Sequence, residues 1–157
     1  YGLGILSKFK IIKSEMVILP HINAEKDFGF LQAVIETPKG KIDVINVHFE
    51  NNDEGSKKHL MFLLDWCKKR NINPIIAGDF NMKETKTLIS LTDKDFFISY
   101  KIKPYLSFMP TEFSNNKEPI TLDYIIASKG KFEFENIKCL DTDISDHKPI
   151  IANINLR

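Results

Sequence analysis

The sequence predicts a single domain of mixed α/β (α+β) class, and three observations support this prediction. The chain has 157 residues, which is the length of one ordinary domain. Hydrophobic residues make up 43% and charged residues 27% of it, so it can build a core. Short β-rich runs separated by turn residues outnumber the helical segments, and one amphipathic helix lies between two of these runs.

The first part of the chain has the pattern of strands around a hairpin. Residues 3–6 form a short apolar run, and residues 15–19 form another. Residues 28–36 and 42–49 predict a hairpin, because the turn-forming sequence Thr-Pro-Lys-Gly at 37–40 lies between them. Apolar residues occupy both alternating sets of positions in the second strand, which predicts that both of its faces are buried.

Helical and β patterns alternate in the rest of the chain. An apolar stripe predicts a helix over residues 56–70, with Trp66 in the core. A short buried strand is expected over residues 75–78, and a weaker helical pattern covers residues 83–91. Three further strands are expected, over residues 122–127, 131–137 and 149–154.

Composition argues against several classes of function. The 22 lysines and arginines are balanced by 21 acids, so bulk charge does not hold this protein to nucleic acid. Cys67 and Cys139 are too few for a disulfide scaffold or a cysteine-rich zinc site. No apolar run approaches the ~20 residues that a membrane span needs, so we expect a soluble protein; the sequence indicates no compartment, because a targeting segment would lie upstream.

An acid and an amide follow the short strand at 75–78. If the backbone stays extended, Asp79 and Asn81 point to the same side, where they can hold a water molecule and a phosphate oxygen. The alternative is a turn in which both side chains cap local backbone groups. The spacing alone does not separate these two interpretations.

Other strand ends carry further polar groups. Asp123 interrupts an apolar strand and must find a partner or be neutralised. His147, just before the last strand, is the most useful partner, because a carboxylate can orient its imidazole. Asp146 offers a hard oxygen ligand of the kind that Mg²⁺ or Mn²⁺ prefers, and His48 ends another β run. Together these groups suit metal-assisted phosphoryl hydrolysis.

Four motifs occur in a fixed order: Asn-Val-His-Phe at 46–49, Gly-Asp-Phe-Asn at 78–81, Leu-Asp-Tyr-Ile at 122–125 and Ser-Asp-His-Lys-Pro-Ile at 145–150. In this order they resemble the endonuclease/exonuclease/phosphatase superfamily of DNase I-like metal-dependent phosphohydrolases. Residues 1–8 also resemble the glycine-led strand of that family. The resemblance implies a DNase I-like four-layer sandwich of two packed mixed β-sheets flanked by helices.

The resemblance also implies a divalent-metal-dependent hydrolase of phosphate ester bonds. A phosphodiesterase or nuclease is the leading expectation. Asp79 matches the acid that positions or deprotonates the attacking water, and Asn81 matches the amide that holds the phosphate. His147 matches the catalytic histidine, and Asp123 matches the carboxylate that orients it. His48 matches a second residue that contacts the phosphate.

One departure from the family concerns the metal. Family members begin with a strand that carries an asparagine and a strand that ends in Gln-Glu, and neither motif precedes Tyr1. We therefore expect residues 1–157 to be the C-terminal portion of a single endonuclease/exonuclease/phosphatase domain, with the N-terminal part missing. Asp146 and Asp79 are the ligands expected in this chain for Mg²⁺ or Mn²⁺.

The expected substrate is a phosphodiester or a phosphomonoester. The sequence does not distinguish nucleic acid from a phospholipid headgroup or a sugar phosphate. Uncovered sheet edges predict self-association. The alternative function is a non-catalytic binding or scaffold domain of the same fold that lacks the metal-binding glutamate, and Mn²⁺ binding by the complete protein would distinguish the two.

Overall fold

The computed structural model of the protein describes residues 2–22, 27–112, 114 and 117–157, and Tyr1 of the opening motif lies outside these ranges. Its strands and helices follow one another along the chain as β1 (Lys10–Ile18), β2 (Gly29–Thr37), β3 (Gly40–His48), α1 (Asp53–Lys69), β4 (Ile75–Asp79), α2 (Thr85–Thr92), β5 (Phe96–Ile98), α3 (Ser99–Ile102), β6 (Asp123–Ser128), β7 (Phe132–Cys139) and β8 (Ile150–Leu156).

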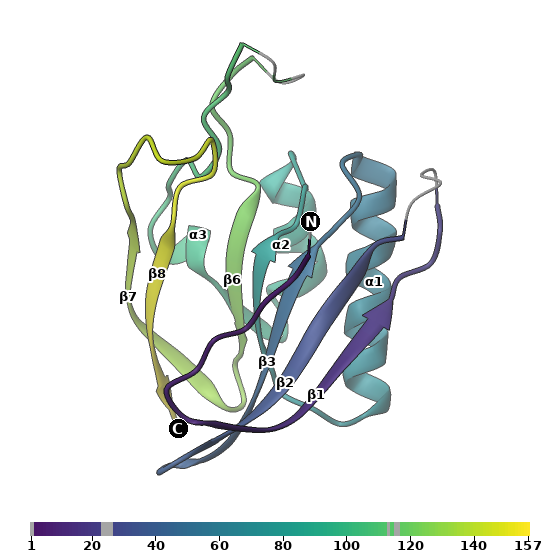
Figure 1. Ribbon diagram of the computed structural model, residues 1–157, viewed down its shortest axis with the longest axis vertical. Helices are drawn as coiled ribbons and strands as arrows, with labels where there is room; N and C mark the ends of the chain where they lie inside the picture. The colour runs from purple at the N-terminus through teal and green to yellow at the C-terminus, as the bar shows by residue number, and fades with distance from the viewer. Residues whose placement is uncertain (1, 23–26, 113, 115–116) are drawn as a thin grey trace.

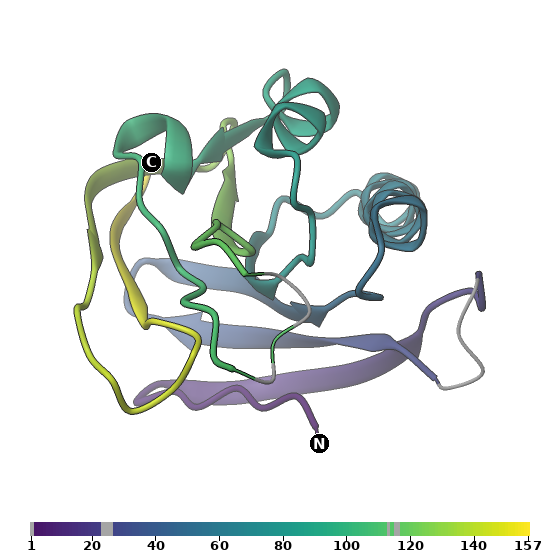
Figure 2. The same ribbon diagram turned by 90° about the horizontal axis from the view of Figure 1, so that it is seen from above.

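A six-stranded mixed sheet forms the centre of the fold (Figure 1). Its strand order is β1-β2-β3-β4-β6-β5, in which β3 and β4 run parallel and all other neighbours run antiparallel. Helices α1 and α2 lie on one side of this sheet, and the two-stranded β7–β8 sheet stands beside β6 (Figure 2). The prediction of a mixed fold with two sheets flanked by helices is therefore confirmed.

The predicted hairpin is present as β2 and β3, with Thr37 opposite Gly40 at its turn. Burial of β3 differs between its faces. Ile45 and Val47 are buried on the side of the helices, whereas Val44 lies on the opposite face and is half-buried. The prediction that both faces are buried therefore holds for the side of the helices and only in part for the second face, which the N-terminal segment crosses (Figure 1).

Three aromatic residues form the part of the core that lies under the ends of neighbouring strands. Phe49, Phe80 and Tyr124 are each 0% exposed. Their rings meet edge to face, with centroids 5.3 Å apart for Phe49 and Phe80 and 5.6 Å apart for Phe80 and Tyr124. Each of them directly follows a polar residue in the sequence, so strand alternation sends that polar side chain to the opposite face of the sheet.

Helix α1 packs its apolar stripe on this core. Leu60 and Leu63 are 0% exposed, as the stripe predicts. The helix begins after Asn52, whose side chain accepts a hydrogen bond of 2.7 Å from the Gly55 N–H as an N-cap. Trp66 lies at the margin of the core rather than inside it, with the Arg70 guanidinium 4.1 Å from its ring centroid.

Two segments differ from the sequence prediction. The apolar run at 3–6 belongs to no strand; it crosses the second face of the sheet, where the Gly4 carbonyl accepts a hydrogen bond of 2.9 Å from Asn46 Nδ2. Strand β5 and the single turn α3 were not expected. Three and four residues are too few to show a hydrophobic period, so only their pairing and packing against β6 define them.

Cys67 is a buried and Cys139 a half-buried free thiol, and burial raises the pKa of the Cys67 thiol to about 12. No helix in the described ranges is long and apolar enough to cross a membrane. Strands β1 and β5 form the edges of the large sheet, and Met16 and Ile18 of β1 are 52% and 56% exposed. Self-association through such edges stays a prediction.

Substitution of Gly78 by alanine is expected to lower the free energy of unfolding by at least about 3 kcal/mol. Gly78 has a φ of +135°, and a Cβ at this position would lie 2.2 Å from the Val47 carbonyl oxygen of the parallel neighbour. Gly130→Ala is the matched control, because a Cβ there meets nothing within 4 Å. Urea unfolding of both variants measures the difference, and equal midpoints would contradict the prediction.

Candidate active site

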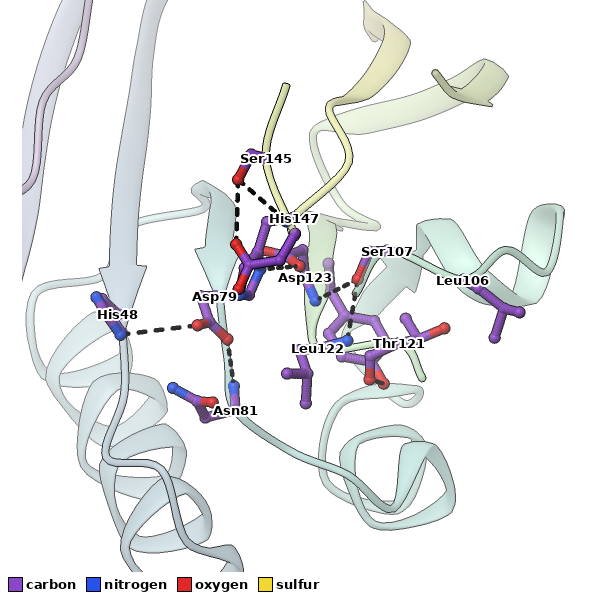
Figure 3. A network of polar contacts seen from close by, with 12 residues as sticks. His48, Asp79, Asn81, Leu106, Ser107, Thr121, Leu122, Asp123, Ser145 and His147 are labelled. Carbon is purple, nitrogen blue, oxygen red and sulfur yellow. Dashed lines mark hydrogen bonds and ion pairs between the residues drawn. The ribbon is translucent and has the colours of Figure 1, made fainter. Parts of the chain in front are cut away.

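The register of three strands brings three polar residues into one row. His48 of β3 lies opposite Asp79 of β4, and Asp79 lies opposite Asp123 of β6. All three side chains stand on the face of the sheet away from the aromatic core (Figure 3). The His48 Nε2 atom is 3.7 Å from Asp79 Oδ2. Residues from three separate motifs thus meet at one end of the sheet.

His147 joins this row from the segment before β8. Its Nδ1 atom lies 2.8 Å from Asp123 Oδ2, which is the His–Asp pair that the sequence predicts (Figure 3). An ionised carboxylate can only accept, so Nδ1 carries the proton and Nε2 is the atom left to face a substrate. This hydrogen bond is the main cause that raises the pKa of His147, and the charges of Asp79 and Asp146 add to it.

Asp79 is the most perturbed acid of the row. Its pKa is raised to about 7, first by burial and then by the negative charge of Asp123. Asp146 raises it further, whereas the Asn81 backbone N–H and the His147 side chain lower it. A carboxyl group that titrates near neutral pH is suited to exchange a proton with water during a reaction.

Asn81 differs from the extended geometry assumed from the sequence. It adopts a φ of +49°, and its backbone N–H donates to Asp79 Oδ1 at 2.8 Å, so the chain turns directly after β4. Its side chain is buried and donates from Nδ2 to the Phe49 carbonyl at 2.9 Å. This bond fixes the turn after Asp79 to the segment after His48. A contact of Asn81 with a phosphate stays a prediction.

The remaining expected residue, Asp146, lies next to the pair. Ser145 Oγ donates to Asp146 Oδ1 at 3.3 Å and accepts from the His147 N–H at 3.1 Å. The Asp146 carbonyl accepts a bond of 2.8 Å from the Met109 N–H. The segment that carries both Asp146 and His147 is therefore held by its own side chains and by the chain around residue 109.

The donor chemistry of this site fits a hard cation. The charges of Asp123 and Asp146 raise the pKa of Asp79, so a bound cation would relieve repulsion between carboxylates. In the described ranges, no three side chains of His, Cys, Asp or Glu are grouped to hold a metal ion. Mg²⁺ often takes only one or two carboxylates and completes its shell with water and substrate phosphate.

Sequence reasoning missed two residues beside the pair. The Phe108 ring centroid lies 5.1 Å from that of His147 and meets it edge to face. Ser107 is 0% exposed, and its Oγ accepts hydrogen bonds at the start of β6. A lone Ser-Phe dipeptide between strands carries no periodic or spacing signal, so only the tertiary structure identifies either residue.

Several proteins that are described in different ways have solved structures with this fold. A functionally unknown conserved protein from Enterococcus faecalis V583 matches with a TM-score of 0.80 and 20% identity, over 96% of this chain and 68% of that one. TDP2 from D. rerio, complexed with a single-strand DNA product, matches with a TM-score of 0.71 and 17% identity, over 93% and 68%. Sphingomyelinase C from Streptomyces griseocarneus matches with a TM-score of 0.69 and 18% identity, over 93% and 65%.

The solved structures show the fold of this chain, and the family profile shows its family. This chain spans about two thirds of the length of each of these three neighbours, and identities of 20% or less show the fold alone. No curated protein matches the sequence. The sequence profile of the Endonuclease/Exonuclease/phosphatase family matches residues 1–147. The chain therefore belongs to the endonuclease/exonuclease/phosphatase family.

Proposed function

We propose that this protein is a divalent-metal-dependent hydrolase of phosphate ester bonds that acts on phosphodiesters. The observation that supports this most is the His147–Asp123 hydrogen bond of 2.8 Å, next to a half-buried Asp79 whose pKa is raised to about 7. Such a set provides one group that donates a proton and one that accepts a proton at neutral pH.

In this proposal, protonated His147 contacts the phosphate through Nε2–H and donates that proton to the leaving oxygen as the ester bond breaks. Asp123 holds the ring in position and stabilises its charged form. Asp79, when ionised, accepts a proton from the attacking water, and His48 beside it contacts the phosphate. Asn81 holds the turn after β4 and is proposed to donate to a phosphate oxygen.

Asp79 and Asp146 are the residues proposed to hold Mg²⁺ or Mn²⁺. The metal would supply charge neutralisation at the phosphate and a lower pKa for its bound water. Asp79 is half-buried and Asp146 is partly exposed, so a cation with its own waters has access to both carboxylates.

A groove beside His48 supports a diester rather than a monoester. It has a volume of about 470 Å³, and its apolar walls include Met16, Ile18 and Phe28. The groove has room for an apolar group on the far side of the phosphate, which a monoester does not carry. Nucleic acids and phospholipids are both diesters. A substrate panel of DNA, RNA and sphingomyelin therefore covers both classes.

Hydrolysis of bis(p-nitrophenyl) phosphate tests the proposed function. We expect turnover with Mg²⁺ or Mn²⁺, loss of turnover in EDTA, and slower release from p-nitrophenyl phosphate. His147→Ala is expected to lose turnover. His21→Ala, which changes an exposed histidine paired with Asp27 at 2.8 Å, is expected to keep it. Absence of metal-dependent turnover in the wild type, or equal effects of the two histidine variants, would contradict the proposal.

A further inference from the structure

The start of β6 is held by one buried serine. Ser107 is 0% exposed, and its Oγ accepts hydrogen bonds from two consecutive backbone N–H groups, those of Leu122 and Asp123, each at 3.0 Å (Figure 3). Both acceptor positions of a hydroxyl oxygen are thereby used. Alanine at this position would leave two backbone donors without this acceptor.

The geometry of these two bonds bends the chain before Asp123. Successive N–H groups of an extended strand point in opposite directions, so they cannot share one acceptor. Because the N–H groups of Leu122 and Asp123 converge on Ser107 Oγ, the backbone is turned between them. The direction in which the Asp123 side chain leaves the backbone therefore depends on this serine.

The same residue also holds the other half of the His–Asp pair. The Ser107 carbonyl accepts a hydrogen bond of 2.7 Å from the N–H of Lys148, the residue directly after His147. Phe108, the next residue, forms a β-bridge with His147 and packs its ring against the imidazole. Ser107 thus bonds through its side chain to the segment of Asp123 and through its backbone to the segment of His147.

We propose that Ser107 is a positioning residue that sets the distance and angle between Asp123 and His147. The expected effect of Ser107 on turnover rests on the proposed function. Its expected effect on the Asp123–His147 hydrogen bond rests on geometry alone. Ser107 contacts neither substrate nor metal in this proposal, and it acts only through the two residues that it holds.

Ser99 of α3 provides a matched control, because it hydrogen-bonds to the same strand, β6. It is also 0% exposed, and its Oγ accepts from the β6 N–H of Ile125 at 3.1 Å. It contacts the Tyr105 hydroxyl at 2.6 Å, and that hydroxyl donates to the Asp123 carbonyl at 3.1 Å. Ser99→Ala therefore removes a buried acceptor from β6 without removing either contact of the Asp123 N–H or carbonyl.

The experiment compares Ser107→Ala, Ser107→Cys and Ser99→Ala. The first measurement is the low-field NMR signal of the His147 Nδ1–H proton, assigned by its loss in His147→Gln. It needs no substrate and no metal. We expect both alanine variants to unfold at lower temperature than the wild type. Only Ser107→Ala is expected to lose this signal or move it upfield, because only there is the Asp123–His147 bond misaligned.

The second measurement is hydrolysis of bis(p-nitrophenyl) phosphate. We expect Ser107→Ala to lower kcat about 10- to 100-fold with KM nearly unchanged, and Ser99→Ala to change kcat less than about twofold. If Ser107→Ala does not fold, Ser107→Cys, which keeps a weaker acceptor, is expected to show the same changes at smaller amplitude.

Two results would overturn the inference. One is an unchanged His147 signal in the Ser107 variants, and the other is an equal change in Ser99→Ala. If the wild type hydrolyses nothing, the proposed function fails, and the NMR measurement still decides the role of Ser107.

Discussion

Asp123→Asn is expected to lower kcat/KM for bis(p-nitrophenyl) phosphate by about 10²- to 10⁴-fold, with the fold retained. The Asp123 carboxylate accepts the bond of 2.8 Å from His147 and is the main cause of the raised pKa of that ring. An amide can turn its NH₂ group toward Nδ1, which would place the proton on Nε2 in a neutral ring. The ring would then keep its position but hold the wrong tautomer, and it would lose the stabilisation of its charged form.

A double-mutant cycle identifies the cause of this loss. Because Asp123 acts through His147, the double variant Asp123→Asn/His147→Gln should be no slower than His147→Gln alone. Asp65→Asn is the control, since Asp65 forms an exposed ion pair with Lys69 on α1 and does not line the groove beside His48. Additive losses in the cycle, or a comparable loss in Asp65→Asn, would contradict the assigned roles.

Asp79→Asn is expected to abolish metal-dependent turnover and at the same time to stabilise the fold by about 2–4 kcal/mol at pH 8. Burial and the charges of Asp123 and Asp146 oppose ionisation of Asp79, and asparagine carries no charge. The bond from the Asn81 N–H to Oδ1 can still form, because asparagine keeps that oxygen. Active-site acids that are needed for chemistry commonly cost stability in this way.

The sign of the pH dependence follows from the folded pKa of about 7, which lies above the ordinary value of 3.8. Between these two values the folded protein keeps a proton that the unfolded chain has released, so stability falls as pH rises through this window. The gain in Asp79→Asn should therefore be full at pH 8 and absent at pH 3.5.

Urea unfolding in EDTA at both pH values measures this gain. Asp65→Asn is the control, because Asp65 forms an exposed pair with Lys69 on α1 and should change stability by less than about 0.5 kcal/mol. A loss of stability in Asp79→Asn at pH 8, or an equal gain at pH 3.5, would contradict the prediction.

Much of the secondary structure follows from local pattern. The turn at 37–40 predicts the β2–β3 hairpin, and the apolar stripe predicts α1, because both signals lie within one short segment. The limits of such signals are seen at β5, whose three residues show no period, and at residues 3–6, which are apolar and form no strand. There the structure depends on contacts with segments that are distant in the chain.

The sequence alone determined which residues lie at strand ends. It also determined that an aromatic residue directly follows each of His48, Asp79 and Asp123. It also predicted the partnership of Asp123 and His147. Only the tertiary structure decided that His48, Asp79 and Asp123 share one row, that the chain turns at Asn81, and that Ser107 hydrogen-bonds to the backbone of Asp123. The physical reason is that strand register and burial arise from contacts between distant segments, which local patterns do not encode.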